Sequence, residues 1–393
     1  MKCRSLVIVV SLVAAGCPQR QDKVKPVLAD PIAVNDGNLV ASIIAELQDE
    51  VLTSYERDEP PDTETGMIPM DIGGARIGVG PGDVLIAEQL ERAPSRWPLR
   101  TDRDTRTEVR SKRLETHLAR DHSAAWVFDE LSWRILMCDR VAVIPLRITM
   151  LYARDGDRWV PIFEHMSFGH TPAPRPEGLY GVRIPSKSVP SSDFVDALSS
   201  AVSPVLSQQA TRTRVATGPE AMLLGPDVEA EWHGADTITA KLAAGPMKTV
   251  EDRRIGYVGR SLEKATIAYW IGNVVADLPA QPGVGAGKVR MRTTFVFERR
   301  RAIAQDDSRS EAERKKLESQ SCGTNPTDCQ WVLVQGHVSE PIGDSELAAF
   351  VFGTALLSPN LESGEPLALT CDDGTPIPAK SPAPSSKQAT PAK

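Results

Sequence analysis

A composite motif that occurs twice constrains the fold of this chain most strongly. Each copy has an Arg-x-Thr-x-x-aromatic-x-Arg segment followed by a Trp-x5-His-x-Ser segment, where x is any residue. The first copy runs from Arg147 to Ser167, and the second runs from Arg292 to Ser339 with an insertion between its segments. Two composite matches in the same order indicate a duplicated structural unit. A chain of 393 residues is long enough for two domains.

Two weaker matches lie upstream of the motif. Ala124–Val127 resembles Ala268–Ile271, which aligns Trp126 with Trp270, and a Gly-Pro pair at Gly80 matches one at Gly225. Both matches precede the motif by similar lengths, so they extend the repeat toward the N-terminal side of each copy.

The first copy of the motif predicts a β-hairpin. Asp155-Gly156 is a strong turn signal between two stretches of alternating apolar residues. A two-residue turn there makes His165 face Leu146 on a mostly apolar face, and it pairs Arg147 with Glu164 on the other face. The alternative register has one more residue in the turn and brings Arg147 opposite His165, because a one-residue slip exchanges the faces of a strand. We prefer the first register.

Amphipathic helices are predicted before each set of strands. Apolar residues recur at helical spacing from Asn38 to Tyr55 and again from Asp193 to Leu206. Asp36-Gly37-Asn38 can cap the start of the first helix, and Ser191 and Ser192 precede the second. Pro204 predicts a kink or break near its end.

The order of these segments resembles the SnoaL-like branch of the nuclear-transport-factor-two-like superfamily. The resemblance rests on the phrase Met222 to Gly234, which contains Glu231 and Trp232, and on the closing Trp-x5-His-x-Ser segment. It implies an α+β fold class with two cone-shaped domains, each with N-terminal helices packed on a curved, mainly antiparallel sheet around a pocket. The first copy lacks the Glu-x-Trp-x-Gly strand of that family, since Asp83 is followed directly by Val84-Leu-Ile-Ala.

The ends of the chain predict export. Lys2 and Arg4 precede an apolar run from Leu6 to Gly16, and Cys17 follows small residues, as in a bacterial lipoprotein cleavage site. An ordinary signal peptide cut near Ala15 is the alternative. We therefore expect a protein of the cell envelope, lipid-anchored at Cys17 to a membrane and facing the periplasm or the cell surface. The expected organisation is a signal peptide at 1–16, a lipidated tether at 17–36, a first domain at 37–172, a linker at 173–190, a second domain at 191–358 with a charged insertion at about 300–329 that is helical from Ser310 to Ser319, and a disordered tail at 359–393.

Six residues are candidates for binding a ligand. Histidine exchanges protons near neutrality, arginine binds anions through a forked donor, and tryptophan offers an apolar surface. The candidates are His165, Arg147, Trp126, His337, Arg292 and Trp232. Structural roles are the alternative: histidines bonded to backbone or to a neighbouring serine, arginines in cross-strand ion pairs, and tryptophans in the core. Catalytic residues are unknown, because no acidic group that would orient either histidine is identifiable.

The cysteines and the net charge limit the partners. An even number of cysteines outside the leader allows disulfides, and turn-forming residues between Cys322 and Cys329 favour a bridge between them, leaving Cys138 with Cys371. A zinc site formed by Cys322, Cys329 and His337 is an alternative with unfamiliar spacing and no fourth ligand. We expect no metal and no cofactor. The net charge of −7, without a large basic patch, argues against nucleic acid as a partner.

Three functions are compatible with this sequence. The leading prediction is a non-enzymatic envelope lipoprotein whose tandem domains bind a small apolar ligand or a protein partner. The second is a pocket enzyme, an isomerase or hydrolase, that uses a histidine or carboxylate in one domain. The third is an architectural protein whose domains pack on each other as a pseudo-dimer.

Overall fold

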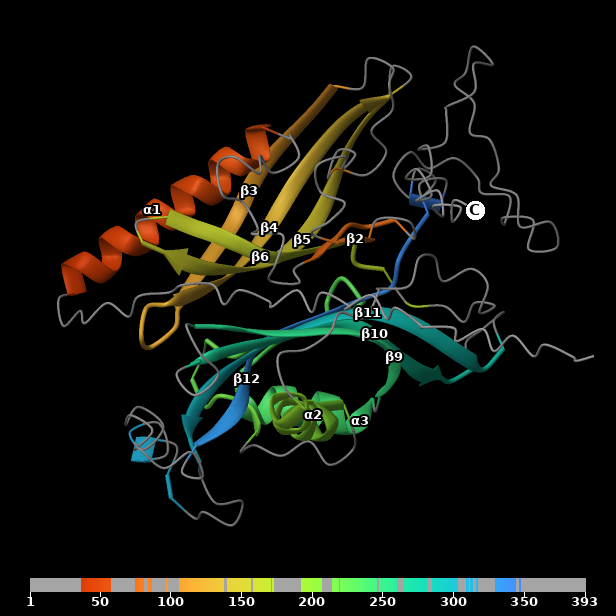
Figure 1. The fold of residues 1–393 in the computed structure, drawn as a ribbon. Helices are drawn as coiled ribbons and strands as arrows, with labels where there is room; N and C mark the ends of the chain where they lie inside the picture. Colours follow the sequence, from red (N-terminus) through yellow and green to blue (C-terminus); the bar gives the residue numbers. More distant parts are fainter. Residues whose placement is uncertain are drawn as a thin grey trace, which may run out of the picture.

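The chain folds as a mixed α+β protein with few helices and two curved sheets (Figure 1). The computed structural model describes residues 37–57, 75–80, 84–86, 97, 106–137, 140–156, 158–170, 172, 192–206, 214–218, 220–245, 247–259, 265–280, 285–302, 309–310, 312–313, 316, 329–343 and 346–347. The α+β class expected from the sequence is thereby confirmed, as is the curvature of the sheets.

Two six-stranded sheets have the same strand order. Sheet A has the order β2-β1-β6-β5-β4-β3 and sheet B the order β8-β7-β12-β11-β10-β9. The strands of sheet A are β1 (Ala75–Ile77), β2 (Val84–Ile86), β3 (Arg106–Leu118), β4 (Ala124–Met137), β5 (Arg140–Asp155) and β6 (Arg158–Ser167). Those of sheet B are β7 (Met222–Leu224), β8 (Glu231–His233), β9 (Met247–Val258), β10 (Ile267–Leu278), β11 (Gly287–Arg301) and β12 (Cys329–Ser339). Only β1 with β6 and β7 with β12 pair in parallel among these strands.

Helices α1, α2 and α3 pack on the outer faces of the sheets, and the inner faces of the two sheets face each other. Helix α1 (Gly37–Arg57) matches the helix predicted from Asn38 to Tyr55 and contacts β3 of sheet A. Helices α2 (Ser192–Leu206) and α3 (Ala235–Ala244) cover the side of sheet B that is turned away from sheet A (Figure 1). Pro204 lies inside α2, which continues to Leu206. Of the predicted kink or break at Pro204, the break does not occur, because a proline in the last turn leaves the earlier helical hydrogen bonds intact.

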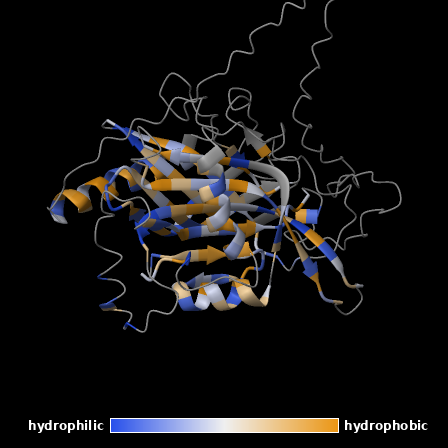
Figure 2. Cartoon of the chain, turned by 60° about the horizontal axis from the view of Figure 1, so that its bottom comes forward, coloured by the Kyte–Doolittle hydropathy of each residue, from blue (hydrophilic) through white to orange (hydrophobic). Residues whose placement is uncertain are grey.

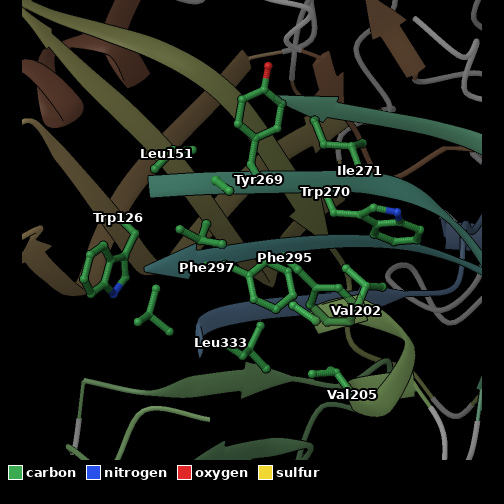
Figure 3. Packing of buried hydrophobic residues seen from close by; sticks show 14 of the residues in the cluster. Trp126, Leu151, Val202, Val205, Tyr269, Trp270, Ile271, Phe295, Phe297 and Leu333 are labelled. Atoms are coloured by element: carbon green, nitrogen blue, oxygen red, sulfur yellow. The ribbon is translucent and has the colours of Figure 1, made fainter. Parts of the chain in front are cut away.

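The outer face of sheet B is a packed apolar core. Trp270 of β10 and Phe295 of β11 stack with ring centroids 5.7 Å apart. Val202 and Val205 of α2 belong to the same buried cluster (Figure 3). Tyr269 and Trp270 are adjacent in β10 and point to opposite sides of the sheet, as strand geometry requires (Figure 3). Along the helices and strands, hydrophobic and hydrophilic residues interchange over short distances (Figure 2), as expected for elements with one buried side.

The preferred register of the hairpin is wrong, and so is the alternative. Asp155 pairs with Arg158, so Asp155 belongs to the strand and not to the turn, and Gly156 follows it at φ 63°. A bulge between Leu151 and Tyr152 then shifts the ladder by one more residue. His165 consequently pairs with Thr149. Sheet B has a bulge at the corresponding place, between Val296 and Phe297. Bulges are not visible in an alternation pattern, since each adds a single unpaired residue.

The alignment of the two tryptophans is also wrong, by one residue. Trp126 pairs with Leu151, whereas Trp270 pairs with Phe295, which corresponds to Met150 in the repeat. Trp126 therefore corresponds to Tyr269, and the two aligned tryptophans point to opposite faces of their sheets. A strand corresponding to β8 exists in the first half as β2, Val84–Ile86, although it lacks the Glu-x-Trp-x-Gly signature.

Several sequence-based expectations lie outside the described residues. These are the signal peptide, the tether with Cys17, the linker at 173–190, most of the insertion and the tail at 359–393. Ser310 and Glu313 form reciprocal hydrogen bonds, as at a helix start. Cys329 is disulfide-bonded, while Cys322, Cys138 and Cys371 lie outside the described part. Within that part, no helix is both long enough and apolar enough to cross a membrane.

Candidate functional site at the seam between the sheets

The inner faces of sheets A and B meet along a buried surface that we call the seam. Strand alternation places the arginine, threonine, histidine and serine of each repeated motif on this inner face. Apolar residues of both sheets, including Leu151 and Phe163 of sheet A and Tyr269 of sheet B, belong to one continuous buried cluster that spans it. The polar members are Arg147, Thr149, His165 and Ser167 from sheet A and Arg292, Thr294, His337 and Ser339 from sheet B.

The two motif histidines stack on each other at the centre of the seam. The ring centroids of His165 and His337 are 3.9 Å apart, with 21° between the ring planes, and both side chains are fully buried. His165 bonds through Nδ1 to the Thr294 hydroxyl at 3.1 Å and through Nε2 to the Ser339 hydroxyl at 2.7 Å.

His337 has the corresponding partners in sheet A. Its Nδ1 bonds to the Thr149 hydroxyl at 3.0 Å and its Nε2 to the Ser167 hydroxyl at 2.8 Å. Each histidine therefore bonds to the threonine and serine of the other sheet. The expectation of a histidine bonded to the serine two residues away in its own strand is wrong in this detail, because the side chains point across the seam.

Both imidazoles are held neutral. Burial lowers the pKa of His165 well below its ordinary value, and the positive charges of Arg292 and Arg147 lower it further. Burial also lowers the pKa of His337 well below its ordinary value, helped by His165 and Arg147. A neutral imidazole has one donor and one acceptor nitrogen, and hydroxyl groups can satisfy either. Each ring is thus fully hydrogen-bonded without a proton from solution.

The two motif arginines bind backbone carbonyls of the opposite half. Arg147 donates to the carbonyl oxygens of Gly225 and Asp227, each at 2.9 Å. Arg292 donates to the carbonyl oxygens of Gly78 at 2.9 Å and Gly80 at 2.7 Å. The acceptors follow β7 and β1, at corresponding places in the two sheets. The expected ion pair between Arg147 and Glu164 is wrong, because the actual register turns Glu164 to the outer face, where it pairs with Arg76.

The segments after the last strand of each sheet also cross to the opposite half. The His170 amide donates to the Pro226 carbonyl, and the Ile342 amide donates to the Val79 carbonyl, both at 3.1 Å. A Cβ on Gly169 would come within 2.6 Å of the Val228 backbone, so glycine permits this close approach. Histidine, arginine and backbone contacts thus repeat in the two directions across the seam.

Charged groups reinforce one edge of the seam. Arg113 of β3 bonds to Glu231 of β8, and Glu231 also accepts from His233 at 2.7 Å. The position of Glu231 is occupied by Val84 in sheet A, according to the strand pairings. This ion pair joins sheet A to sheet B but is not repeated by a glutamate at the corresponding position of sheet A, unlike the contacts of the motif residues.

The remaining two binding candidates lie away from the histidine pair. Trp126 is buried on the inner face of β4, where its ring stacks with His117 at 6.0 Å between centroids. Trp232 is half-buried against the apolar cluster, and the Lys241 amine lies 5.7 Å from its ring centre. The structure thus brings together four of the six candidates.

One buried acidic residue, Asp129, was missed in the sequence. It lies on the outer face of β4, where its side chain accepts hydrogen bonds from Ser111 at 2.9 Å and Tyr55 at 3.2 Å. Burial raises the pKa of this carboxyl to about 6, against the lowering effect of those hydrogen bonds. The signal was available: alternation in β4 places Asp129 between Val127 and Leu131 on an otherwise apolar face.

The seam chemistry is that of a closed hydrogen-bonded interface. All four ring nitrogens of His165 and His337 have hydroxyl partners. Arg147 and Arg292 each bind two carbonyls of the opposite half. Within the described ranges, no group of three or more histidine, cysteine or acidic side chains is arranged to hold a metal ion.

Comparisons with known proteins give partial structural likenesses only. No protein-family model matches the chain, and no curated protein matches it. A protein of Xanthomonas campestris assigned as a calcium/calmodulin-dependent protein kinase II association domain shares 15% identity over 40% of this chain and 96% of its own, with a TM-score of 0.24. An uncharacterised protein with a cystatin-like fold from Caulobacter vibrioides shares 13% over 39% of this chain and 94% of its own, with a TM-score of 0.24. A de novo NTF2 protein shares 16% over 34% of this chain and all of its own, with a TM-score of 0.19. These likenesses assign no family to the chain.

Proposed function

We propose that the chain is an architectural protein of the cell envelope, in which two SnoaL-like, cone-shaped halves associate as an internal dimer. In this role the contacts of the seam hold the two halves in one rigid arrangement. The outer surfaces of that arrangement then bind other components of the envelope. The observation that carries the proposal is the reciprocal pattern of contacts made by the repeated motif across the seam.

The reciprocal contacts argue for an interface that acts as a unit. A guanidinium group that donates two hydrogen bonds to carbonyls is well placed only when the opposite half is present. The same holds for each imidazole, whose hydroxyl partners come from the other sheet. Removing a single partner within the intact seam would leave a buried donor or acceptor unsatisfied, at about 1–3 kcal/mol for each group. The motif residues therefore favour association over exchange of a ligand.

Membrane attachment is part of the proposal. The sequence before Gly37 supports it through the apolar run and the small residues before Cys17. Mass spectrometry of protein extracted from membranes tests it: diacylglyceryl-modified Cys17 is expected at the mature N-terminus. An unmodified mature chain would exclude the anchor and leave the seam argument unaffected.

Cleavage of the connection between the halves tests the internal dimer. A protease site is inserted between residues 175 and 188 of the full chain, and the cut protein is analysed by size-exclusion chromatography at micromolar concentration. We expect the two fragments to elute together and to unfold in a single transition. Fragments that separate in native buffer would refute the proposal.

A matched variant makes the cleavage result specific. The same site is inserted in a chain that carries Arg147→Ala and Arg292→Ala, which lose four charge-assisted hydrogen bonds across the seam. The cut fragments of this variant are expected to dissociate at higher concentration than those of the parent chain. Identical dissociation of the two cut proteins would show that the arginines do not hold the halves together.

A further inference from the structure

Helix α1 is attached to sheet A along a narrow apolar stripe. Its buried residues are Ile43, Leu47, Val51 and Tyr55, at four-residue spacing. Leu39 and Leu52, beside that stripe, are 46% and 41% exposed. A helix held by one row of side chains has a small apolar contact area. The polar contacts of α1 with the sheet add to the attachment that these apolar side chains provide.

Asp129 is the centre of one polar contact between α1 and the sheet. The Tyr55 hydroxyl at the end of the stripe donates to one carboxylate oxygen, and the Ser111 hydroxyl of β3 donates to the other. The Tyr55 ring also packs edge-on against Trp97, with centroids 5.9 Å apart. Asp129 is completely shielded from solvent. The three residues thus join α1, β3 and β4 at one buried point.

Among the residues that the structure describes, the groups that face Asp129 supply no positive charge. Tyr55 comes from α1, while Ser111 and the backbone amide of Arg113 come from β3; the pairing residue on β5 is Ile148. Arg113 directs its side chain to the inner face, where it bonds to Glu231. On β4 itself the neighbouring charge is Glu130, which disfavours a second negative charge.

The second half of the chain lacks this arrangement. The repeat places Gly272 of β10 at the position that corresponds to Asp129, since Ile271 pairs with Thr294 as Phe128 pairs with Thr149. Trp270, Phe295 and the valines of α2 fill the outer face there. The buried carboxyl is therefore a feature that the first half has in addition to the shared fold.

We propose that Tyr55, Ser111 and Asp129 form a latch whose protonation controls how firmly α1 is held on sheet A. With the carboxyl protonated, the buried site carries no net charge and α1 stays docked. Loss of the proton leaves an anion enclosed without a cation, and opening of α1 lets water solvate it. Acid therefore closes this latch, and neutral pH loosens it.

Hydrogen exchange of the α1 amides in the full chain tests the latch. The carboxyl has a pKa of about 6 when docked and 3.8 when solvated. Linkage between these two values gives an opening equilibrium about tenfold larger at pH 7.5 than at pH 5.0. Protection factors, corrected for the intrinsic exchange rate at each pH, are expected to fall by that factor in α1 relative to α2. Equal protection of α1 at the two pH values would overturn the proposal.

Three variants separate the latch from general destabilisation. Asp129→Asn keeps a polar group without a titrating proton, so the tenfold pH effect on α1 should disappear. Asp155→Asn, at a partly exposed carboxylate of the hairpin, should retain it. Tyr55→Phe removes the donor on α1 and should lower α1 protection about fivefold at both pH values. An undiminished pH effect in Asp129→Asn, or unchanged α1 protection in Tyr55→Phe, would contradict the latch.

Discussion

Acid should weaken the protein through the stacked histidines of the seam. An imidazole with a pKa near 6.5 in the unfolded chain binds a proton there below that pH, while the folded seam keeps His165 and His337 neutral. Stability from this source is complete above the unfolded pKa and is lost as the pH falls below it. Because the folded seam disfavours the protonated form of both rings, each contributes a loss of up to about 2 kcal/mol between pH 7.5 and 5.0, or up to about 4 kcal/mol together.

Urea unfolding followed by tryptophan fluorescence measures this loss. Wild type is compared with the double variant His165→Gln and His337→Gln, which replaces both imidazoles with amides that do not titrate. The difference in unfolding free energy between the two proteins should shrink by up to about 4 kcal/mol from pH 7.5 to 5.0. Taking the difference removes the opposite contribution of Asp129, which both proteins share.

A matched core variant distinguishes titration from loss of packing. Val338→Ala alters a buried side chain of β12, next to His337, without removing a titratable group. Its stability should lie below that of wild type by a constant amount across the pH range. The reasoning is refuted if the double histidine variant also runs parallel to wild type.

The remaining predictions concern the other seam contacts and the packing of sheet B. Arg292→Lys and Arg147→Lys should each lower the unfolding free energy by about 1–3 kcal/mol, because an ammonium cannot place two donors in a fixed fork. Denaturant titration should give similar values for both variants. An unchanged unfolding free energy at either position would contradict the reciprocal arrangement. Gly336→Ala should cost about 1–3 kcal/mol, since its Cβ would lie 2.6 Å from Leu223 and 3.0 Å from the Phe295 ring; a melting temperature equal to that of wild type would show that β12 can shift to accommodate the methyl group.

The sequence predicted the elements well where a local pattern determines them. Spacing of apolar residues located α1 within two residues at each end. The duplicated motif located two strand pairs, β5 with β6 and β11 with β12. Four of the six binding candidates were brought together by the structure.

The faces and partners of those residues were not predictable in the same way. The bulge between Leu151 and Tyr152 reversed which side of the strand His165 and its neighbours occupy, and a bulge changes the count of residues without changing their character. The partner of Arg147 lies 78 residues along the chain, on the backbone of a loop. Backbone carbonyls carry no sequence signature, so an acidic side chain such as Glu164 was the natural but incorrect partner to expect.

The crossing segments have a consequence for biosynthesis. The apolar core beneath α1 includes Ile342 and Leu347, which are translated more than three hundred residues after the helix begins. The N-terminal half cannot complete its own interior while the ribosome is still making the rest, so it must remain incomplete until nearly the whole polypeptide is available. A chain with this dependence suits a route in which folding is postponed until synthesis has finished, and truncation before Ile342 should yield a product that chaperones and proteases recognise as unfinished.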